Sequence, residues 1–114
     1  MRKNIVVSYT VRPDAYAEHV RLIEGVFAQL RAQRPDTVDY QVMCLADGVS
    51  FVHVSTHDTA DGANPLPALP AFQEFSRDVG ARVTTPPAPS EAATIGAYRG
   101  LSDAAVSHPA GQPR

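Results

Sequence analysis

The stretch TVDYQVMCLADGVSFVHVSTH, residues 37–57, decides the fold of this chain. Asp47-Gly48 separates two runs of β-forming residues, and Asp-Gly between alternating apolar residues is the strongest short-range signal for a β-hairpin. We predict a two-residue type I′ turn at this dipeptide. The turn sets the cross-strand register as four pairs: Ala46 with Val49, Cys44 with Phe51, Val42 with His53, and Tyr40 with Ser55.

The predicted hairpin has two different faces, because successive strand residues point to opposite sides of a sheet. One face carries Val38, Tyr40, Val42, Cys44, Phe51, His53 and Ser55. The other face carries Gln41, Met43, Leu45, Val52 and Val54. Both faces are largely apolar, so we expect each of them to be covered.

The segments before the hairpin are a strand and a helix. Residues 4–11 (NIVVSYTV) are rich in β-branched and aromatic residues, which is typical of a strand. Residues 14–34 follow the spacing of an amphipathic helix that Pro35 ends. Its apolar positions are Tyr16, Val20, Ile23, Phe27 and Leu30.

The segments after the hairpin are a second helix and a fourth strand. Prolines and turn residues in 58–70 and 84–91 indicate connecting loops. We predict a helix that starts near Pro67 or Pro70 and runs to about Val79 or Arg82. Residues 92–99 (AATIGAYR) are then the predicted fourth strand.

The resulting order, β-α-β-β-α-β, predicts an α+β ferredoxin-like fold with both helices on one face of a four-stranded antiparallel sheet. We expect one domain, 1–101, followed by a flexible tail, 102–114. The open face of the sheet is apolar on the hairpin, and such a face predicts a partner. A second copy of the chain would cover it with a closed two-fold interface, so we expect a homodimer.

At this level the sequence resembles the dimeric α/β-barrel superfamily, and within it the antibiotic biosynthesis monooxygenase-like domains. The resemblance covers roughly residues 4–100 and is carried by the hairpin run FVHVSTHD and by NPLPALPAFQEF at the second helix. It implies a dimeric barrel with a pocket between the helices and the sheet of each subunit. The family includes cofactor-independent monooxygenases of polycyclic aromatics, haem-degrading enzymes and proteins of unassigned reaction. Unlike several members, this chain contains no Trp.

Composition excludes several classes of function. The 10 basic and 12 acidic residues form no long run of either sign, which argues against nucleic acid as a partner. No segment has the length or apolar character of a membrane span or a signal peptide. The single Cys44 fits a reducing compartment, and we expect it to be buried and unreactive. We therefore predict a cytoplasmic protein with no membrane partner.

His53 and Tyr40 are the predicted catalytic residues, because they put polar groups on an apolar face of the hairpin. A pocket with a few converging polar groups is the usual small-ligand site. His53 is suited to act as a general base or as a hydrogen-bond donor to a phenolic substrate. The alternative is a core or interface histidine with its hydrogen-bond partners across the barrel. His19 faces the same gap from the first helix, and a His19–His53 pair would be more informative than either residue alone.

The predicted substrate-binding residues are Tyr9, His19, Phe27, Phe51, Ser55, Asn64, Phe72 and Tyr98. Asn64 has the alternative role of stabilising the turn before the second helix. We expect no metal, since His53 and His57 lie about 13 Å apart by strand rise. His57 and His108 are expected to be solvated.

The resemblance implies a small cofactor-independent monooxygenase that acts on an aromatic or quinol-like metabolite, and the hairpin face supplies the candidate residues. In the reaction that the resemblance implies, the electron-rich substrate itself reduces oxygen. A second hypothesis is a non-catalytic small-molecule-binding or stress-associated protein that uses the same pocket. A third is a dimerising module with a filled core and no pocket.

Overall fold

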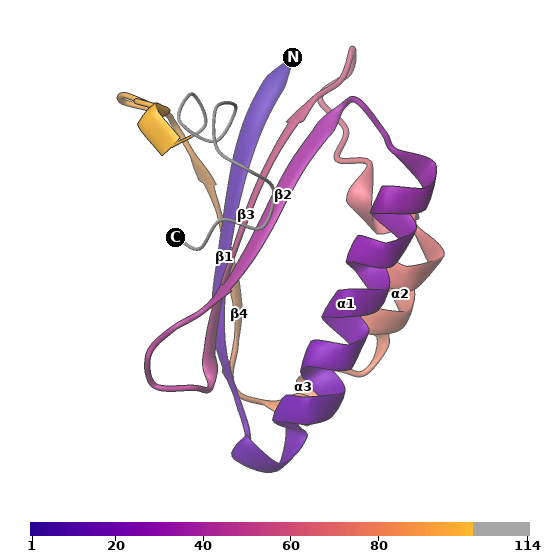
Figure 1. Ribbon diagram of the computed structural model, residues 1–114, viewed down its shortest axis with the longest axis vertical. Helices are drawn as coiled ribbons and strands as arrows, with labels where there is room; N and C mark the ends of the chain where they lie inside the picture. The colour runs from indigo at the N-terminus through magenta and orange to yellow at the C-terminus, as the bar shows by residue number, and fades with distance from the viewer. Residues whose placement is uncertain (102–114) are drawn as a thin grey trace.

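The computed structural model describes residues 1–101, so the predicted flexible tail and His108 lie outside the described residues. Four strands form one antiparallel sheet in the order β2-β3-β1-β4. The strands are β1 (Arg2–Val11), β2 (Val38–Cys44), β3 (Ser50–Asp58) and β4 (Val83–Ala92). The helices are α1 (Tyr16–Gln33), α2 (Pro70–Arg77) and α3 (Val79–Arg82), with short 3₁₀ turns η1 (Pro13–Ala15) and η2 (Leu66–Ala68). The helices lie on one side of the sheet (Figure 1), which confirms the predicted ferredoxin-like subunit.

The hairpin has the predicted register but not the predicted turn. Cys44 pairs with Phe51 as expected, and the pairing continues along β2 and β3. The connection is four residues long, 46–49, because Leu45 N–H donates to Ser50 O at 2.8 Å and Gly48 N–H donates to Leu45 O at 3.0 Å. Only Gly48 of the Asp-Gly pair has a positive φ, 79°, whereas a type I′ turn needs two such residues.

The first helix, α1, covers nearly the residues predicted for it, 14–34. α1 ends at Gln33 and is capped by Arg34, whose left-handed φ of 53° accompanies the bond from its N–H to Leu30 O at 2.7 Å; Pro35 then prevents continuation. The predicted set of inward-facing apolar positions on this helix is only partly right, since Tyr16 is exposed. The buried helix residues are His19, Leu22, Ile23 and Val26.

The fourth strand lies where we expected a connector. β4 covers the Pro-rich residues 83–92, and the predicted strand at 92–99 is wrong. The physical reason is position, because β4 is an edge strand that pairs only with β1. An edge strand needs backbone donors on one side alone, so it tolerates prolines that a central strand rejects. The register shifts twice between Ser8 and Val11, and Pro86 and Pro87 lie at the first shift, between Ser8 and Thr10.

The second helix agrees in outline with the prediction. It begins at Pro70, breaks at Asp78 and resumes as α3, which ends at Arg82. The break matters for the site, because α3 places Arg82 just before β4, where its side chain reaches His19 on α1. Among residues 1–101, no helix is long and apolar enough to cross a membrane.

The core lies between the helices and the inner face of the sheet. Along β3 every second residue is buried there, from Phe51 to His57. The principal core cluster comprises Tyr9, Val11, Leu22, Ile23, Val26, Phe51 and Phe75. Two expectations fail at the ends of the hairpin strands. Cys44 is exposed, and His57 is 2% exposed, with Nε2 bonded to Gly62 O at 2.8 Å under the loop that follows β3.

Candidate functional site

Five side chains form one continuous line of hydrogen bonds between the sheet and the helices. Tyr9 Oη lies 2.6 Å from His19 Nε2 and 2.6 Å from His53 Nε2. At one end, Tyr40 Oη lies 2.6 Å from His53 Nδ1. At the other end, Arg82 Nε donates to His19 Nδ1 at 3.0 Å. We call Arg82–His19–Tyr9–His53–Tyr40 the Tyr–His chain.

Strand register explains why His53 joins the two tyrosines. Its direct partners are Val7 on β1 and Val42 on β2. Tyr9 and Tyr40 lie two residues from those partners, so both point to the same inner face as His53. Such diagonal neighbours are within reach of long side chains. His19 and Arg82 are then added from α1 and α3.

Aromatic rings enclose the centre of the Tyr–His chain. Phe51 lies against His19 with ring centroids 4.9 Å apart and stacks on Tyr9 at 5.7 Å. The Arg82 guanidinium lies over Phe75, 5.4 Å from the ring centroid, and also donates to the Phe75 carbonyl. His19 is fully buried, and Tyr9, His53 and Arg82 are buried too. These rings keep water from the central hydrogen bonds and so strengthen them.

Burial sets the ionisation of the Tyr–His chain. It lowers the pKa of His19 to about 4, with a further contribution from the positive charge of Arg82. Burial, and then His19, lowers the pKa of His53 to about 4. Burial also raises the pKa of both Tyr9 and Tyr40. At neutral pH the histidines are therefore uncharged and the phenols keep their protons.

Arg82 is the one charged member of the Tyr–His chain. Burial lowers the pKa of its guanidinium, which nevertheless stays charged at neutral pH. Within residues 1–101 no carboxylate forms a salt bridge with it. Its partners are instead the His19 ring, the Phe75 carbonyl and the Phe75 ring.

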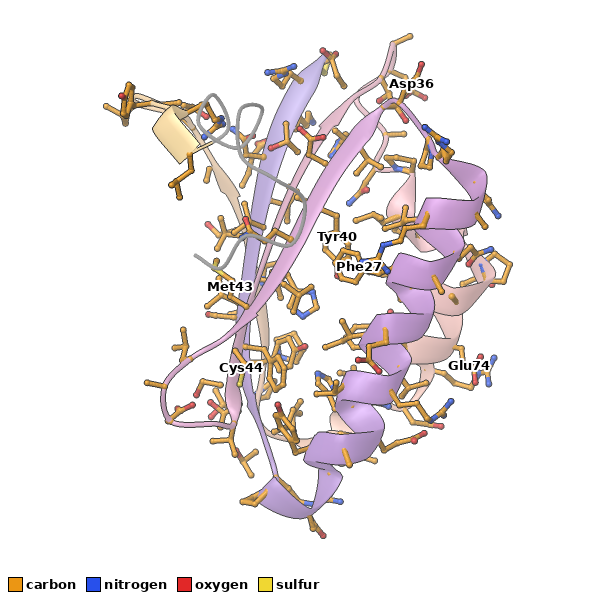
Figure 2. The ribbon with its side chains drawn as sticks, in the orientation of Figure 1. Phe27, Asp36, Tyr40, Met43, Cys44 and Glu74 are labelled. Carbon is orange, nitrogen blue, oxygen red and sulfur yellow. The ribbon has the colours of Figure 1, made fainter. Side chains whose placement is uncertain are left out.

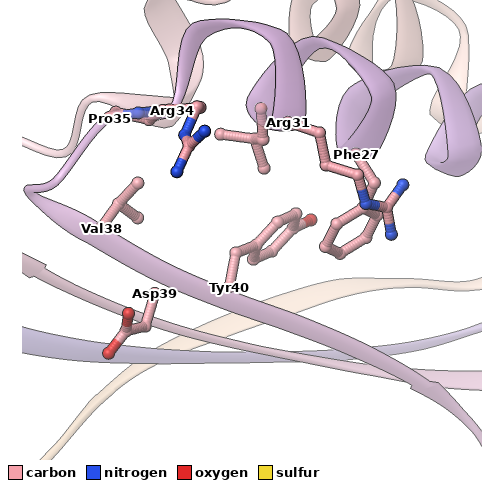
Figure 3. Close-up of a pocket in the computed structure, with 8 residues that line it drawn as sticks. Phe27, Arg31, Arg34, Pro35, Val38, Asp39 and Tyr40 are labelled. Atoms are coloured by element: carbon pink, nitrogen blue, oxygen red, sulfur yellow. The ribbon is translucent and has the colours of Figure 1, made fainter. Parts of the chain in front are cut away.

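Tyr40 connects the Tyr–His chain to a groove between α1 and β2. Figure 2 shows Tyr40 and Phe27 between the sheet and α1, and their rings stack with centroids 5.1 Å apart and planes 13° apart. The groove has a volume of about 340 Å³. Figure 3 shows the side chains that line it. It is lined by Phe27, Leu30, Arg31, Arg34, Pro35, Val38, Asp39 and Tyr40. We call it the Tyr40 groove, and its size and mixed lining are those of a small-ligand site.

Most of the predicted site residues lie together. His53, Tyr40, Tyr9 and His19 are consecutive in the Tyr–His chain, although Tyr9 separates the two histidines that we expected to pair directly. The predicted aromatic residues surround them: Phe27 and Phe72 next to Tyr40, and Phe51 next to Tyr9. Ser55 is buried on the same face of β3.

Two predicted binding residues lie elsewhere. Tyr98 is 91% exposed in the segment after β4, because the predicted strand that would have turned it inward does not form. Asn64 Oδ1 accepts a hydrogen bond from Leu66 N–H at 3.0 Å, which is the turn-stabilising alternative.

Sequence reasoning missed Arg82 and Phe75 as site residues. Phe75 carried an apolar helical signal only, and Arg82 looked like an ordinary basic residue at a helix end. In the part of the chain that the structure describes, no three potential metal ligands gather.

Comparison with known proteins decides the fold family. No protein-family model and no curated protein matches the chain, but solved structures do. Rv0793 from Mycobacterium tuberculosis has a TM-score of 0.70 at 20% identity, with 85% of this chain and 98% of that one covered. A putative antibiotic biosynthesis monooxygenase from Nitrosomonas europaea has a TM-score of 0.68 at 14% identity, with coverages of 82% and 90%. The chain has the fold of the antibiotic biosynthesis monooxygenases.

A third neighbour with the antibiotic biosynthesis monooxygenase fold has a described activity. A mutant of SnoaB, a cofactor-independent oxygenase from Streptomyces nogalater, has a TM-score of 0.64 at 18% identity, and the match covers 86% of this chain and 97% of that one. At these identities the likeness is one of fold. The resemblance stated from the sequence and the expected fold are confirmed.

Proposed function

We propose that the protein is a small oxygenase that needs no cofactor and acts on an aromatic or quinol-like metabolite bound in the Tyr40 groove. The observation that carries this proposal is that Tyr40, whose hydroxyl ends the buried Tyr–His chain, also lines that groove. The same fold in SnoaB, a cofactor-independent oxygenase, supports it.

The proposed oxygenation requires few catalytic groups from the protein. An electron-rich substrate, as a phenolate or carbanion, itself passes electrons to oxygen. The protein then has to hold the substrate oxygen, stabilise charge at that oxygen and keep water away. Tyr40 supplies a neutral donor, since burial raises the pKa of its phenol. Phe27, which stacks on Tyr40, adds an apolar side chain to the lining of the groove.

His53 acts in this proposal by positioning Tyr40. Both of its ring nitrogens are engaged, Nε2 with Tyr9 Oη and Nδ1 with Tyr40 Oη. A base needs a free lone pair within reach of the substrate proton. The general-base role considered from the sequence therefore gives way to the hydrogen-bond role.

Oxygen uptake tests the proposal. We expect a panel of naphthols, anthrones and hydroquinones to contain substrates whose addition makes the protein consume oxygen without added flavin, haem or metal. Tyr40→Phe removes the donor and should lower kcat by roughly 10²-fold or more. Tyr98→Phe is the matched control, because Tyr98 is 91% exposed outside the groove, and its uptake should be unchanged.

The same experiment separates the oxygenase from the other two hypotheses left open by the sequence, a small-molecule-binding protein and a dimerising module without a pocket. Binding of the panel without oxygen uptake would favour a small-molecule-binding protein. Absence of both binding and uptake would refute the oxygenase proposal.

We also propose that two copies of the chain assemble through the open face of the sheet. Val6 pairs with Val54, and Met43 with Val52, on the side away from the helices. Figure 2 shows Met43 on that side. These apolar side chains form a face suited to a two-fold interface. Light scattering should give the mass of a dimer, and Val54→Lys should give a monomer; a monomeric parent protein would contradict this.

A further inference from the structure

Every hydrogen bond in the Tyr–His chain needs one donor and one acceptor, and Arg82 decides which is which. A guanidinium has donors only, so Arg82 Nε–H donates and His19 Nδ1 must accept. A neutral imidazole carries one proton. With Nδ1 accepting, that proton is on Nε2, and His19 Nε2–H donates to Tyr9 Oη.

The same reasoning fixes the remaining bonds. The single proton of Tyr9 Oη is directed at His53 Nε2, which must accept it. His53 is then protonated on Nδ1 and donates to Tyr40 Oη. Tyr40 keeps its own proton for another acceptor. Among residues 1–101, the bond to His53 is the only hydrogen bond that Tyr40 Oη makes.

We propose that Arg82 is a positioning residue that fixes the direction of the Tyr–His chain. As a result the proton of Tyr40 Oη is left for a ligand in the groove that Tyr40 lines, and the groove selects aromatic ligands that present an anionic oxygen, a phenolate or enolate, over the neutral phenol. This inference rests on the proposed function in one respect, that the ligand lies in the Tyr40 groove.

The opposite direction is disfavoured by the geometry at Arg82. If Tyr40 Oη instead accepted from the ligand and donated to His53 Nδ1, that nitrogen would have to be unprotonated and each bond in turn would have to reverse. His19 would then carry its proton on Nδ1, facing Arg82 Nε–H at 3.0 Å. Two buried donors would face each other without an acceptor, which costs at least about tenfold in population.

The proton of the ligand therefore does not enter the Tyr–His chain. The ligand O–H bond breaks in solution, the proton goes to water, and the anion binds with its oxygen accepting from Tyr40. The groove rim supports an anion, because Arg31 and Arg34 line it against a single carboxylate, Asp39. Arg31 also lies over the Phe27 ring, 5.8 Å from its centroid.

The experiment uses 4-nitrophenol, whose phenolate is coloured, as a probe of the full-length protein. The pKa of the bound probe is read from its absorbance as pH is varied. We expect phenolate to bind at least about tenfold more tightly than phenol, so the bound probe has a pKa about one unit or more below that of the free probe. Tyr40→Phe and Arg82→Met should each remove most of this difference.

Control variants separate the effect of the direction of the Tyr–His chain from the effect of positive charge alone. Arg77→Met removes an exposed arginine at the end of α2 and should leave the bound pKa unchanged. Arg82→Lys keeps a charged donor and should retain part of the preference, provided circular dichroism shows a folded protein. Tyr40→Phe keeps both rim arginines, so a preference that survives it would overturn the inference.

Other outcomes of this experiment distinguish failure of the inference from failure of the proposed function. A bound pKa equal to or above that of the free probe, or one that Arg82→Met leaves unchanged, would overturn the inference while oxygen uptake stands. A lowered bound pKa without any oxygen uptake would support the inference and refute the oxygenase function. Failure of the probe to bind at all would overturn the inference, and uptake measured on the same preparation would show whether the proposed function survives.

Discussion

The two buried histidines predict a loss of stability between pH 7 and pH 5. Burial lowers the pKa of His19 and of His53 to about 4, from an ordinary value of 6.5. In this window the unfolded chain binds a proton at each histidine and the folded chain does not. Stability therefore rises with pH here, and it is lost as the pH falls.

The magnitude follows from the two pKa values. At pH 5 an unfolded histidine is almost fully protonated, whereas a folded histidine with a pKa of about 4 is mostly neutral. Integrating the difference gives about 2 kcal/mol for each residue, or about 4 kcal/mol together. A domain of this size has a total stability of roughly 5–15 kcal/mol, so the loss is large.

Urea unfolding at pH 7, 6 and 5, followed by circular dichroism, measures the effect. The slope near pH 5.5 should correspond to uptake of close to two protons on unfolding at His19 and His53. Exposed carboxylates with lowered pKa, such as Asp47 and Asp58, lose their contribution only at lower pH and do not disturb this window. A change in unfolding free energy below about 1 kcal/mol would refute the reasoning, because the histidines would then titrate while folded.

Other predictions follow from single features of the fold. Tyr9→Phe leaves two buried histidine nitrogens without a partner and should lower the unfolding free energy in urea by about 2–4 kcal/mol; Tyr16→Phe, at an exposed ring, should change it by under about 0.5 kcal/mol. Gly48→Ala should lower the unfolding free energy by about 1 kcal/mol, because the φ of Gly48 is 79°. Gly25→Ala, in open space on α1, should raise the unfolding free energy by about 0.5–1 kcal/mol. A Gly48→Ala protein more stable than the Gly25→Ala protein would contradict both expectations. Cys44 is exposed, so the native protein should react with a thiol reagent as fast as the unfolded one.

Local patterns were enough to predict most of the fold. The alternation in residues 37–57 gave the hairpin register, and the helical spacing in 14–34 gave α1. The turn type differed because side-chain hydrogen bonds decided it, with the Asp47 carboxylate accepting from the N–H groups of Val49 and Ser50. β4 was missed because proline is a breaker in a central strand and tolerated at an edge, and sequence alone does not say which strand is at the edge.

The site was predicted as a set of residues but not as a chemical arrangement. Strand alternation placed Tyr40 and His53 on one face, and helical spacing placed His19 opposite them. The hydrogen bonds among them depend on diagonal reach across three strands. Arg82, which decides their direction, comes from a helix end far along the chain, and no local pattern connects it with His19.

The protonation of the His53 ring tests the central claim most directly. Long-range ¹H–¹⁵N correlation at pH 7 distinguishes Nδ1–H from Nε2–H in a neutral histidine, and His53→Gln assigns the signals. The directed Tyr–His chain predicts the proton on Nδ1 of His53 and on Nε2 of His19. A His53 ring protonated on Nε2, or a cationic one, would contradict the account.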